Sequence, residues 1–215
     1  MRILALDAAL AWCSVALLED GAVLAEICLP GGRGHHHQLP RMARDVLGDG
    51  PHPDAIAVTT GPGSFTGLRA ALALAHGLSA GLCPVLGVTV AEALAEAVHL
   101  PPGFALWTAI DSRRGRIFLD RDATLAAIEL TAIETPTRPI AVAGDAAADL
   151  VARLAARGAT MMLTDARQPL ARHVARVGLR RLNGELPPLA AQPLYVDPPE
   201  ASLPPGGLRP QPLPQ

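Results

Sequence analysis

The clearest pattern in the sequence is a strand, a glycine loop, a helix and a second strand. Ala55 to Thr60 is a short apolar run rich in β-branched residues, which is typical of a buried strand. Gly61-Pro62-Gly63 ends this strand, because two glycines allow backbone angles that a side chain forbids. Ser64 suits the N-cap of a helix over residues 65–80, since its hydroxyl can accept a hydrogen bond from the first turn. Residues 85–88 predict the next strand, so the stretch favours an α/β fold.

The predicted helix carries one charged side chain, Arg69, and small residues recur along it at helical spacing. A helix this apolar is buried, either inside its own domain or by a partner. The loop before it has two interpretations. Gly61, Gly63 and Gly67 lead into a helix N-terminus, where phosphates bind in many proteins, but their spacing matches neither the Walker A loop nor the dinucleotide fingerprint. The alternative is a tight turn that sets the helix against the sheet.

The first hundred residues predict the order strand, strand, strand, helix, strand, helix, strand, helix. The three opening strands are expected at residues 3–6, 13–18 and 22–28. Asp20-Gly21 predicts the hairpin between the last two, because this pair accepts positive φ angles. Apolar residues at helical spacing predict a helix over residues 38–47, and Thr89 with Glu92 predicts a capping box for the last helix. This order matches the ribonuclease-H-like unit that builds actin, the sugar kinases and the heat-shock ATPases.

The second half repeats the start of the first in a weaker form. LALDAALAWCSVAL at residues 4–17 and TAIDSRRGRIFL at residues 108–119 are each an apolar strand, an aspartate, a turn and another apolar strand. This repeat predicts a duplicated fold with a reduced second unit. Later elements are expected as a helix over 145–157, a strand over 160–163 and a helix from 169 to 183. The predicted domains are residues 1–100, a smaller unit 101–197 and a proline-rich tail 198–215.

Two motifs connect the chain to a known family. GPGSFTGLR at residues 61–69, followed by PVLGVTVAEALA at residues 84–95, resembles the TsaB (YeaZ) family, whose members are subunits of bacterial tRNA threonylcarbamoyladenosine biosynthesis. DSRRGRIF at residues 111–118 resembles the second motif of that family, and PLYV at residues 193–196 resembles its terminal strand, which implies a strand there. The chain departs from the family pattern at Asp197, where the family usually has an arginine, and this weakens any role for a C-terminal arginine.

The resemblance implies a set of motif residues around a vestigial nucleotide loop. In this chain they are Asp7, Gly61, Gly63, Ser64, Gly67, Arg69, Asp111, Arg113, Arg114 and Gly115. The resemblance also implies the duplicated actin-like (ASKHA) fold, in which aspartates such as Asp7 and Asp111 orient a metal ion and phosphates. Here the turn after Asp7 is Ala8-Ala9-Leu10, with neither a glycine nor a hydroxyl. We therefore expect Asp7 to cap the turn, and we expect no ATP hydrolysis.

Composition removes several other mechanisms. All 18 basic residues are arginines, so no P-loop lysine or Schiff-base lysine exists. His35 to His37 are adjacent in a loop and cannot easily converge on one ion, so we expect no native metal and no cofactor. Cys13, Cys28 and Cys83 have no ligand spacing and are expected to be reduced core thiols. The N-terminus does not resemble a signal peptide and no apolar run reaches membrane-spanning length, so we expect a cytoplasmic protein.

Two groups of arginines are candidate contacts for tRNA phosphates. One is the cluster of Arg113, Arg114 and Arg116, and the other is the helical stripe of Arg172, Arg176 and Arg180. A solvated helix face is the plainer interpretation of the stripe. Aromatic residues make up 3% of the chain and do not interleave with these arginines, so base stacking is not supported there.

The family resemblance predicts a scaffold subunit without activity of its own. Its partners would be a catalytic TsaD-like paralogue and a TsaE-like ATPase, with a homodimer possible for the free chain and tRNA contact possible within the complex. The interface is expected on two helices, at Leu39, Met42, Ala43, Val46, Leu47, Leu68, Ala71, Leu72 and Ala75. These residues could instead be core. A small ASKHA-type kinase or ATPase and a glycoprotease-like peptidase are the alternative functions.

Overall fold

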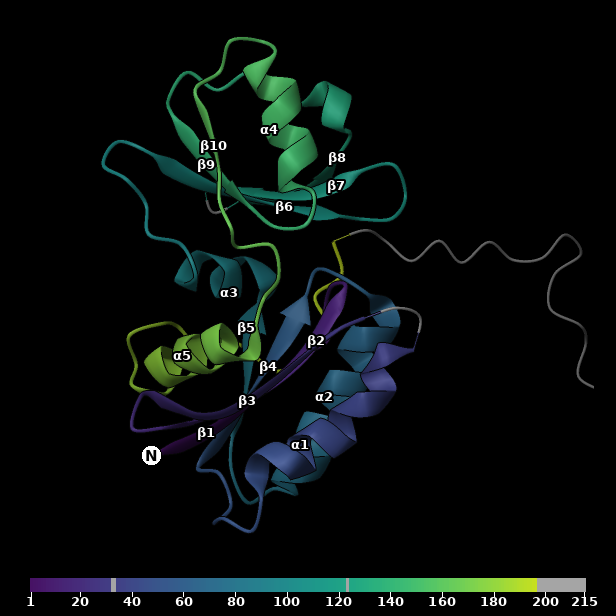
Figure 1. Cartoon of the computed structure of the whole chain (residues 1–215), viewed down its shortest axis with the longest axis vertical. Helices are drawn as coiled ribbons and strands as arrows, with labels where there is room; N and C mark the ends of the chain where they lie inside the picture. Colours follow the sequence, from purple (N-terminus) through teal and green to yellow (C-terminus); the bar gives the residue numbers. More distant parts are fainter. Residues whose placement is uncertain (32–33, 123, 197–215) are drawn as a thin grey trace, which may run out of the picture.

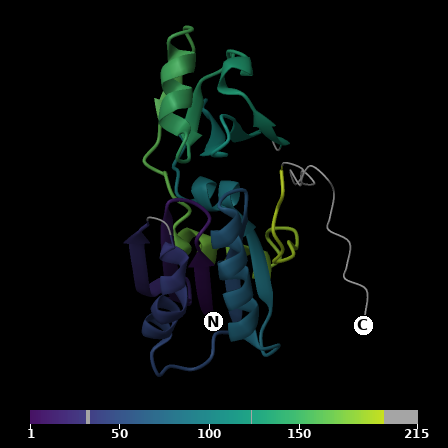
Figure 2. The ribbon, with the colours of Figure 1, turned by 90° about the vertical axis from the view of Figure 1, so that its right-hand side faces the viewer.

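The computed structural model describes residues 1–31, 34–122 and 124–196, which form two α/β units stacked along the long axis (Figure 1 and Figure 2). The first unit has a five-stranded sheet with the order β3-β2-β1-β4-β5. The β1–β2 and β2–β3 pairs are antiparallel, whereas β1–β4 and β4–β5 are parallel. The strands are β1 (Arg2–Asp7), β2 (Trp12–Glu19), β3 (Ala22–Pro30), β4 (Ala55–Gly61) and β5 (Val85–Thr89).

The second unit has a sheet that follows the same path. Its order is β8-β7-β6-β9-β10, with two antiparallel pairs and then two parallel pairs. The strands are β6 (Ala105–Asp111), β7 (Ile117–Arg121), β8 (Thr124–Ile128), β9 (Ile140–Ala143) and β10 (Met161–Leu163). The predicted duplication is thus confirmed in the topology. β8 and β9 were not expected from the sequence, because five-residue and four-residue strands carry too little periodicity.

Helices cover both faces of the first sheet (Figure 1). α1 (Leu39–Leu47) and α2 (Phe65–Ser79) pack on one face. The second unit is reduced in helices rather than strands, since α4 (Ala147–Ala155) covers its sheet and a three-residue 3-10 turn, η2 (Leu130–Ala132), precedes β9. A further 3-10 turn, η1 (His35–Gln38), precedes α1. None of the helices in the described part of the chain is long and apolar enough to cross a membrane.

α5 (Ala171–Leu182) crosses back to the first unit. Val174, Ala175 and Val177 pack with residues of β1, β2 and β4, on the sheet face opposite to α1 and α2. The backbone N–H of Ala171 donates to the Ser14 hydroxyl at 2.8 Å. The packing of α5 therefore does not follow the expected boundary, which placed this helix in a unit of residues 101–197. Sequence order suggested that boundary, but apolar burial on the first sheet decides where the helix lies.

The segment after α5 also returns to the first unit. Residues 193–196 form no strand, contrary to the prediction from the sequence. A single bridge joins Leu86 to Ala190, and the Leu194 N–H donates to the Thr60 carbonyl at 2.8 Å. Prolines without an N–H interrupt this segment, so a continuous ladder cannot form. Asp197 and the predicted tail of residues 198–215 lie outside the described residues.

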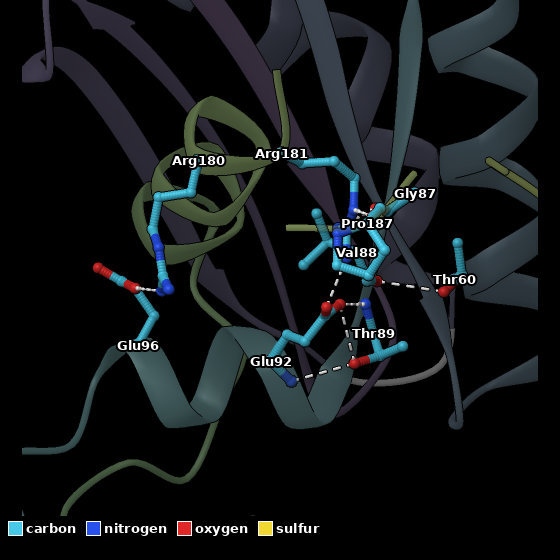
Figure 3. A network of polar contacts seen from close by, with 9 residues as sticks. All are labelled: Thr60, Gly87, Val88, Thr89, Glu92, Glu96, Arg180, Arg181 and Pro187. Carbon is cyan, nitrogen blue, oxygen red and sulfur yellow. Dashed lines mark hydrogen bonds and ion pairs between the residues drawn. The ribbon is translucent and has the colours of Figure 1, made fainter. Parts of the chain in front are cut away.

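A buried arginine holds these returning elements together (Figure 3). The Arg181 guanidinium, at the end of α5, donates to the Gly87 carbonyl at 2.6 Å and to the Pro187 carbonyl at 2.7 Å. It also pairs with Glu92, at 2.5 Å, in α3 (Val90–Glu96). Glu92 closes the predicted capping box with Thr89, whose hydroxyl accepts from the Glu92 N–H. One guanidinium thus ties α5 to α3, β5 and the chain after α5.

Candidate functional site

Asp7 ends β1 and is completely enclosed by the first unit. One carboxylate oxygen accepts from the Ala9 N–H at 3.1 Å and from the Thr59 hydroxyl at 2.8 Å. This is the predicted capping of the turn, with a second hydrogen bond from β4. No basic side chain in the described residues pairs with Asp7 in a salt bridge, and burial raises the pKa of its carboxyl to about 7. The group is therefore partly neutral near physiological pH.

The glycine loop packs directly on the turn after Asp7. The Ser64 N–H donates to the Ala9 carbonyl at 2.7 Å. A Cβ added at Gly63 would lie 2.3 Å from the Ala9 oxygen, and one added at Gly67 would lie 2.0 Å from the Ala8 oxygen. The Ser64 hydroxyl caps α2 by accepting from the Gly67 N–H at 3.2 Å. These glycines therefore serve close backbone contact, which favours the tight-turn interpretation over a phosphate cradle.

The turn after Asp111 repeats the first turn in the second unit. Its carboxylate accepts from the Arg113 N–H at 2.8 Å, two residues on, as Asp7 does from Ala9. The Asp111 N–H in turn donates to Asp145 at 2.9 Å. The Arg113 guanidinium lies 3.4 Å from Asp111 and 3.7 Å from Asp145. Burial raises the pKa of Asp145, while the Asp111 N–H and Arg113 partly oppose this shift.

Gly115 closes this second turn with a φ of 74°, which favours glycine. The Ser112 hydroxyl and N–H both donate to the Arg116 carbonyl, at 2.6 Å and 3.2 Å. Arg113 and Arg114 are exposed at the tip. The expected motif residues of the second unit thus form one compact, charged hairpin.

An apolar layer joins the two units between these turns. It contains Leu10 from the first turn, Leu68 of α2, Leu94 of α3 and Ile110 of β6. Ile110 and Leu94 are fully buried and Leu10 is 6% exposed. The units are therefore held by apolar contact, and the side chains in this layer offer no charge or hydroxyl to a ligand.

The predicted interface residues lie inside the first unit. Eight of the nine have exposed fractions of 5% or less, and Leu47 is partly buried. Seven of the eight pack against the first sheet, and Leu68 lies in the apolar layer between the units. The residues so buried are Leu39, Met42, Ala43, Val46, Leu68, Ala71, Leu72 and Ala75. These positions fit the core interpretation, because amphipathic helices turn such stripes toward their own sheet. A partner could reach only the opposite sides of α1 and α2.

The outward face of α2 begins with an aromatic–arginine cluster that was not predicted as a unit. The Arg69 guanidinium carbon lies 3.9 Å from the centre of the Phe65 ring. Nε and Nη2 of Arg69 donate to the Tyr195 hydroxyl at 3.4 Å and 3.1 Å. Phe65 and Arg69 are four residues apart on one helix, which is a local signal. Tyr195 is 126 residues from Arg69, so no local pattern links it to them.

The other candidate residues are dispersed or already paired. Arg172 pairs with Glu26, and Arg180 with Glu96 and Glu185, so much of the predicted basic stripe is neutralised. Within residues 1–31, 34–122 and 124–196, no group of three or more His, Cys, Asp or Glu side chains is placed to hold a metal ion.

The cysteines do not form a reactive centre. Cys13, Cys28 and Cys83 form no disulfide bond among the described residues. Burial raises the pKa of the Cys13 and Cys28 thiols to about 11, so neither is a thiolate near neutral pH. Nucleophilic catalysis by either side chain is therefore not supported.

Comparison with known proteins gives a consistent result. A family model described as tRNA N6-adenosine threonylcarbamoyltransferase (TsaD) matches residues 30–177. The tRNA threonylcarbamoyladenosine biosynthesis protein TsaB of Escherichia coli K12 is 37% identical over 126 residues, which are 55% of this chain and 53% of that protein. The chain thus spans about half the length of the curated relatives it matches.

Solved structures extend the similarity to nearly the whole chain. YeaZ from Pseudomonas aeruginosa is 26% identical with a TM-score of 0.72, covering 90% of this chain and 99% of that one. A ROK family protein from Streptococcus pneumoniae TIGR4 has a TM-score of 0.50 at 9% identity, covering 86% of this chain and 100% of that one. The second comparison concerns the fold alone.

Proposed function

The chain belongs to the tRNA N6-adenosine threonylcarbamoyltransferase (TsaD) family, and we propose that it acts there as a TsaB-type accessory subunit. In this role it binds a catalytic TsaD-like paralogue and supports transfer of the threonylcarbamoyl group to the adenosine beside the tRNA anticodon. The family assignment and the named TsaB relatives support the pathway. Such a role would place the chain in the cytoplasm.

The contact between the glycine loop and the Asp7 turn carries the accessory part of the proposal. Gly63 and Gly67 have backbone carbonyls where a side chain or a phosphate oxygen would otherwise lie. The Ser64 N–H, which could bind an anion, donates to Ala9 instead. A nucleotide phosphate needs free N–H groups at such a helix start. We therefore propose that the chain supports catalysis by a partner and does not turn over ATP itself.

The outward face of α2 is the surface we propose for that partner. Arg69, Ala73, His76 and Gly77 are exposed along it, and Leu74 is half-buried beside them. Small exposed residues let a second helix approach closely. A separate recess near the C-terminal ends of α1 and α2 is lined by residues that include Leu47, His52 and Leu78. Figure 2 shows the two helices side by side on this flank.

The same face would serve a second copy of the chain when the paralogue is absent. A TsaE-like ATPase would join the assembled pair, and the Arg113 hairpin is the more open of the two arginine groups for tRNA. Each of these associations follows from the family role and remains part of the proposal.

Reconstitution tests the proposed function. The TsaD-like protein and the remaining biosynthetic proteins of the same organism are combined with tRNA, threonine, bicarbonate and ATP, with or without this chain. We expect threonylcarbamoyladenosine, measured by mass spectrometry of digested tRNA, to form at least about tenfold faster with the chain present. Equal rates would refute the accessory role. ATP turnover by the chain alone that is lost in Asp7→Asn would show that it is an enzyme.

A further inference from the structure

An exposed cluster of unusual composition lies at the N-terminal end of α2. We call Phe65, Arg69 and Tyr195 the Arg69 cluster, and Leu194 precedes Tyr195 in the chain. Phe65 is 57% exposed, Tyr195 55% and Leu194 37%, although the chain has only six Phe, Trp and Tyr residues. The rings of Phe65 and Tyr195 are 6.2 Å apart between their centres. Two of the few aromatic side chains are thus held together in solvent around one guanidinium.

The cluster orients Arg69 and leaves part of it free to bind. Phe65 covers one face of the guanidinium, and the Tyr195 hydroxyl accepts from Nε and Nη2. A guanidinium has five N–H donors in a planar fork. The Nη1 donors and one Nη2 donor therefore remain, and they form the end of the fork that binds both oxygens of a carboxylate. A fork already fixed in this way loses little rotamer freedom when it binds.

Within the described ranges, the charge of Arg69 is not neutralised by an acidic side chain. Among the described residues no acidic side chain forms a salt bridge with Arg69, whereas Arg172 and Arg180 are paired. The first turn of α2 contains no acidic residue. The positive end of the helix dipole adds to the same field. The cluster therefore presents uncompensated positive charge inside an apolar rim.

We propose that the Arg69 cluster is an anchor for an aspartate or glutamate side chain of a protein partner docked on the outward face of α2. This inference rests on the proposed function, because it places the anchor at one end of that surface. Phe65, Arg69, Ala73 and Gly77 follow one another at four-residue spacing along the helix. A partner helix lying on the small residues would bring its carboxylate to the Nη1–Nη2 edge.

The composition favours protein over RNA as the occupant. Tyr and Arg are enriched in the hot spots of protein interfaces, where apolar contacts exclude water around one polar pair. RNA binding instead draws its affinity from several phosphate contacts. Among the described residues, Arg69 is the only basic side chain that takes part in the hydrogen bonds and ring contacts of the cluster. One cation in an apolar rim fits a single carboxylate.

The test measures binding of the purified TsaD-like protein of the same organism to the full chain by calorimetry, at 50 mM and 300 mM NaCl. We expect Arg69→Gln to raise the dissociation constant by roughly 30-fold at low salt, and by less at high salt. Tyr195→Phe keeps the ring but removes the hydroxyl that orients the fork, so a loss of about threefold is expected. Arg138→Gln is the matched control, because it removes an exposed arginine of the second unit that pairs with Asp122.

Exchanging the charges of Arg69 and the partner residue tests whether the bound group is a carboxylate of the partner. Arg69→Glu should abolish binding, and an arginine at one partner carboxylate should restore it. If wild type binds and Arg69→Gln matches Arg138→Gln, the anchor is wrong and the proposed function stands. If wild type does not bind the TsaD-like protein, the proposed function fails and the anchor with it. If Arg69→Gln weakens binding to a tRNA transcript but not to the protein, the cluster is an RNA contact and the inference is overturned.

Discussion

The turns after Asp7 and Asp111 begin with the same hydrogen bond and have opposite surroundings. In both, the aspartate accepts from the N–H two residues later and ends the central strand of its sheet. The first turn is apolar, is packed under the glycine loop and leaves its carboxyl buried. The second turn is charged and open, with a guanidinium between two carboxylates. Duplication has thus kept the framework, while the side chains after the aspartate decide whether the turn is core or surface.

Burial explains why the two turns lie in such different places. Ala8 and Ala9 are small enough for α2 to approach, and Leu10 enters the apolar layer between the units. Ser112, Arg113 and Arg114 would have to lose their hydration to occupy the same place, which is costly for charged groups. The first turn therefore contributes to holding the molecule together, and the second is available for recognition.

The largest expected effect comes from breaking the contact under the first turn. Gly67→Ala would place a Cβ 2.0 Å from the Ala8 carbonyl oxygen, so the helix or the turn must shift. We expect the free energy of unfolding to fall by about 3 kcal/mol, measured by urea denaturation.

Gly77→Ala is the control within the same helix. Its Cβ would meet nothing within 4 Å, and alanine is the better helix former. It should stabilise the chain by about 0.5–1 kcal/mol. Similar effects of the two substitutions would contradict the close packing of α2 on the first turn.

The second prediction concerns how the free energy of unfolding depends on pH through the buried Asp7. Because burial raises the pKa of Asp7 to about 7 in the folded chain, above its ordinary value of 3.8, the folded state holds a proton that the unfolded state has lost. The free energy of unfolding should therefore fall as pH rises through the range from about 4 to 7. Asp7→Asn keeps an oxygen acceptor without the charge, so it should remove this dependence and stabilise the chain at pH 8 by about 2 kcal/mol.

Asp111→Asn provides the comparison, since Asp111 is much more exposed and its ion pair lies at the surface. We expect a change of less than about 1 kcal/mol at pH 8. Thermal denaturation between pH 5 and pH 8 checks both variants. A destabilised Asp7→Asn at pH 8 would mean that the charged carboxylate itself is needed by the fold.

Much of this framework could be predicted because it depends on local sequence patterns. The strand before Asp7, the hairpin at Asp20-Gly21, the Ser64 cap and the Thr89 capping box all depend on neighbours within a few residues. The repeated strand–aspartate–turn–strand pattern was enough to predict the duplication. The contact between Gly67 and Ala8 was not visible, because it depends on how two such elements pack.

The features that the sequence did not reveal are contacts between residues that are distant in sequence. The apolar pattern of α5 would allow the helix to pack on either sheet. Its buried contacts with β1 and the hydrogen bonds of Arg181 show that it packs on the first sheet. The apolar stripe on α1 predicts that one face of the helix is buried, but the pattern does not identify the element that covers this face. Tyr195 reaches Arg69 across 126 residues, so no spacing rule could have joined them.

The smallest expected effect on the free energy of unfolding comes from removing the charge of Arg113 in the second turn. Arg113 is 69% exposed by its side chain, and its pairs with Asp111 and Asp145 are 3.4 Å and 3.7 Å long. Arg113→Gln keeps a long polar side chain at the same backbone position and removes only the charge. We expect the free energy of unfolding to fall by about 0.5 kcal/mol, because solvent screens such pairs. The loss should shrink between 50 mM and 500 mM NaCl, since added salt weakens the pairing in wild type. Urea denaturation at both salt concentrations measures it. A loss above about 2 kcal/mol that salt does not change would mean that the second turn is as structural as the first, and the contrast between the two turns would fail.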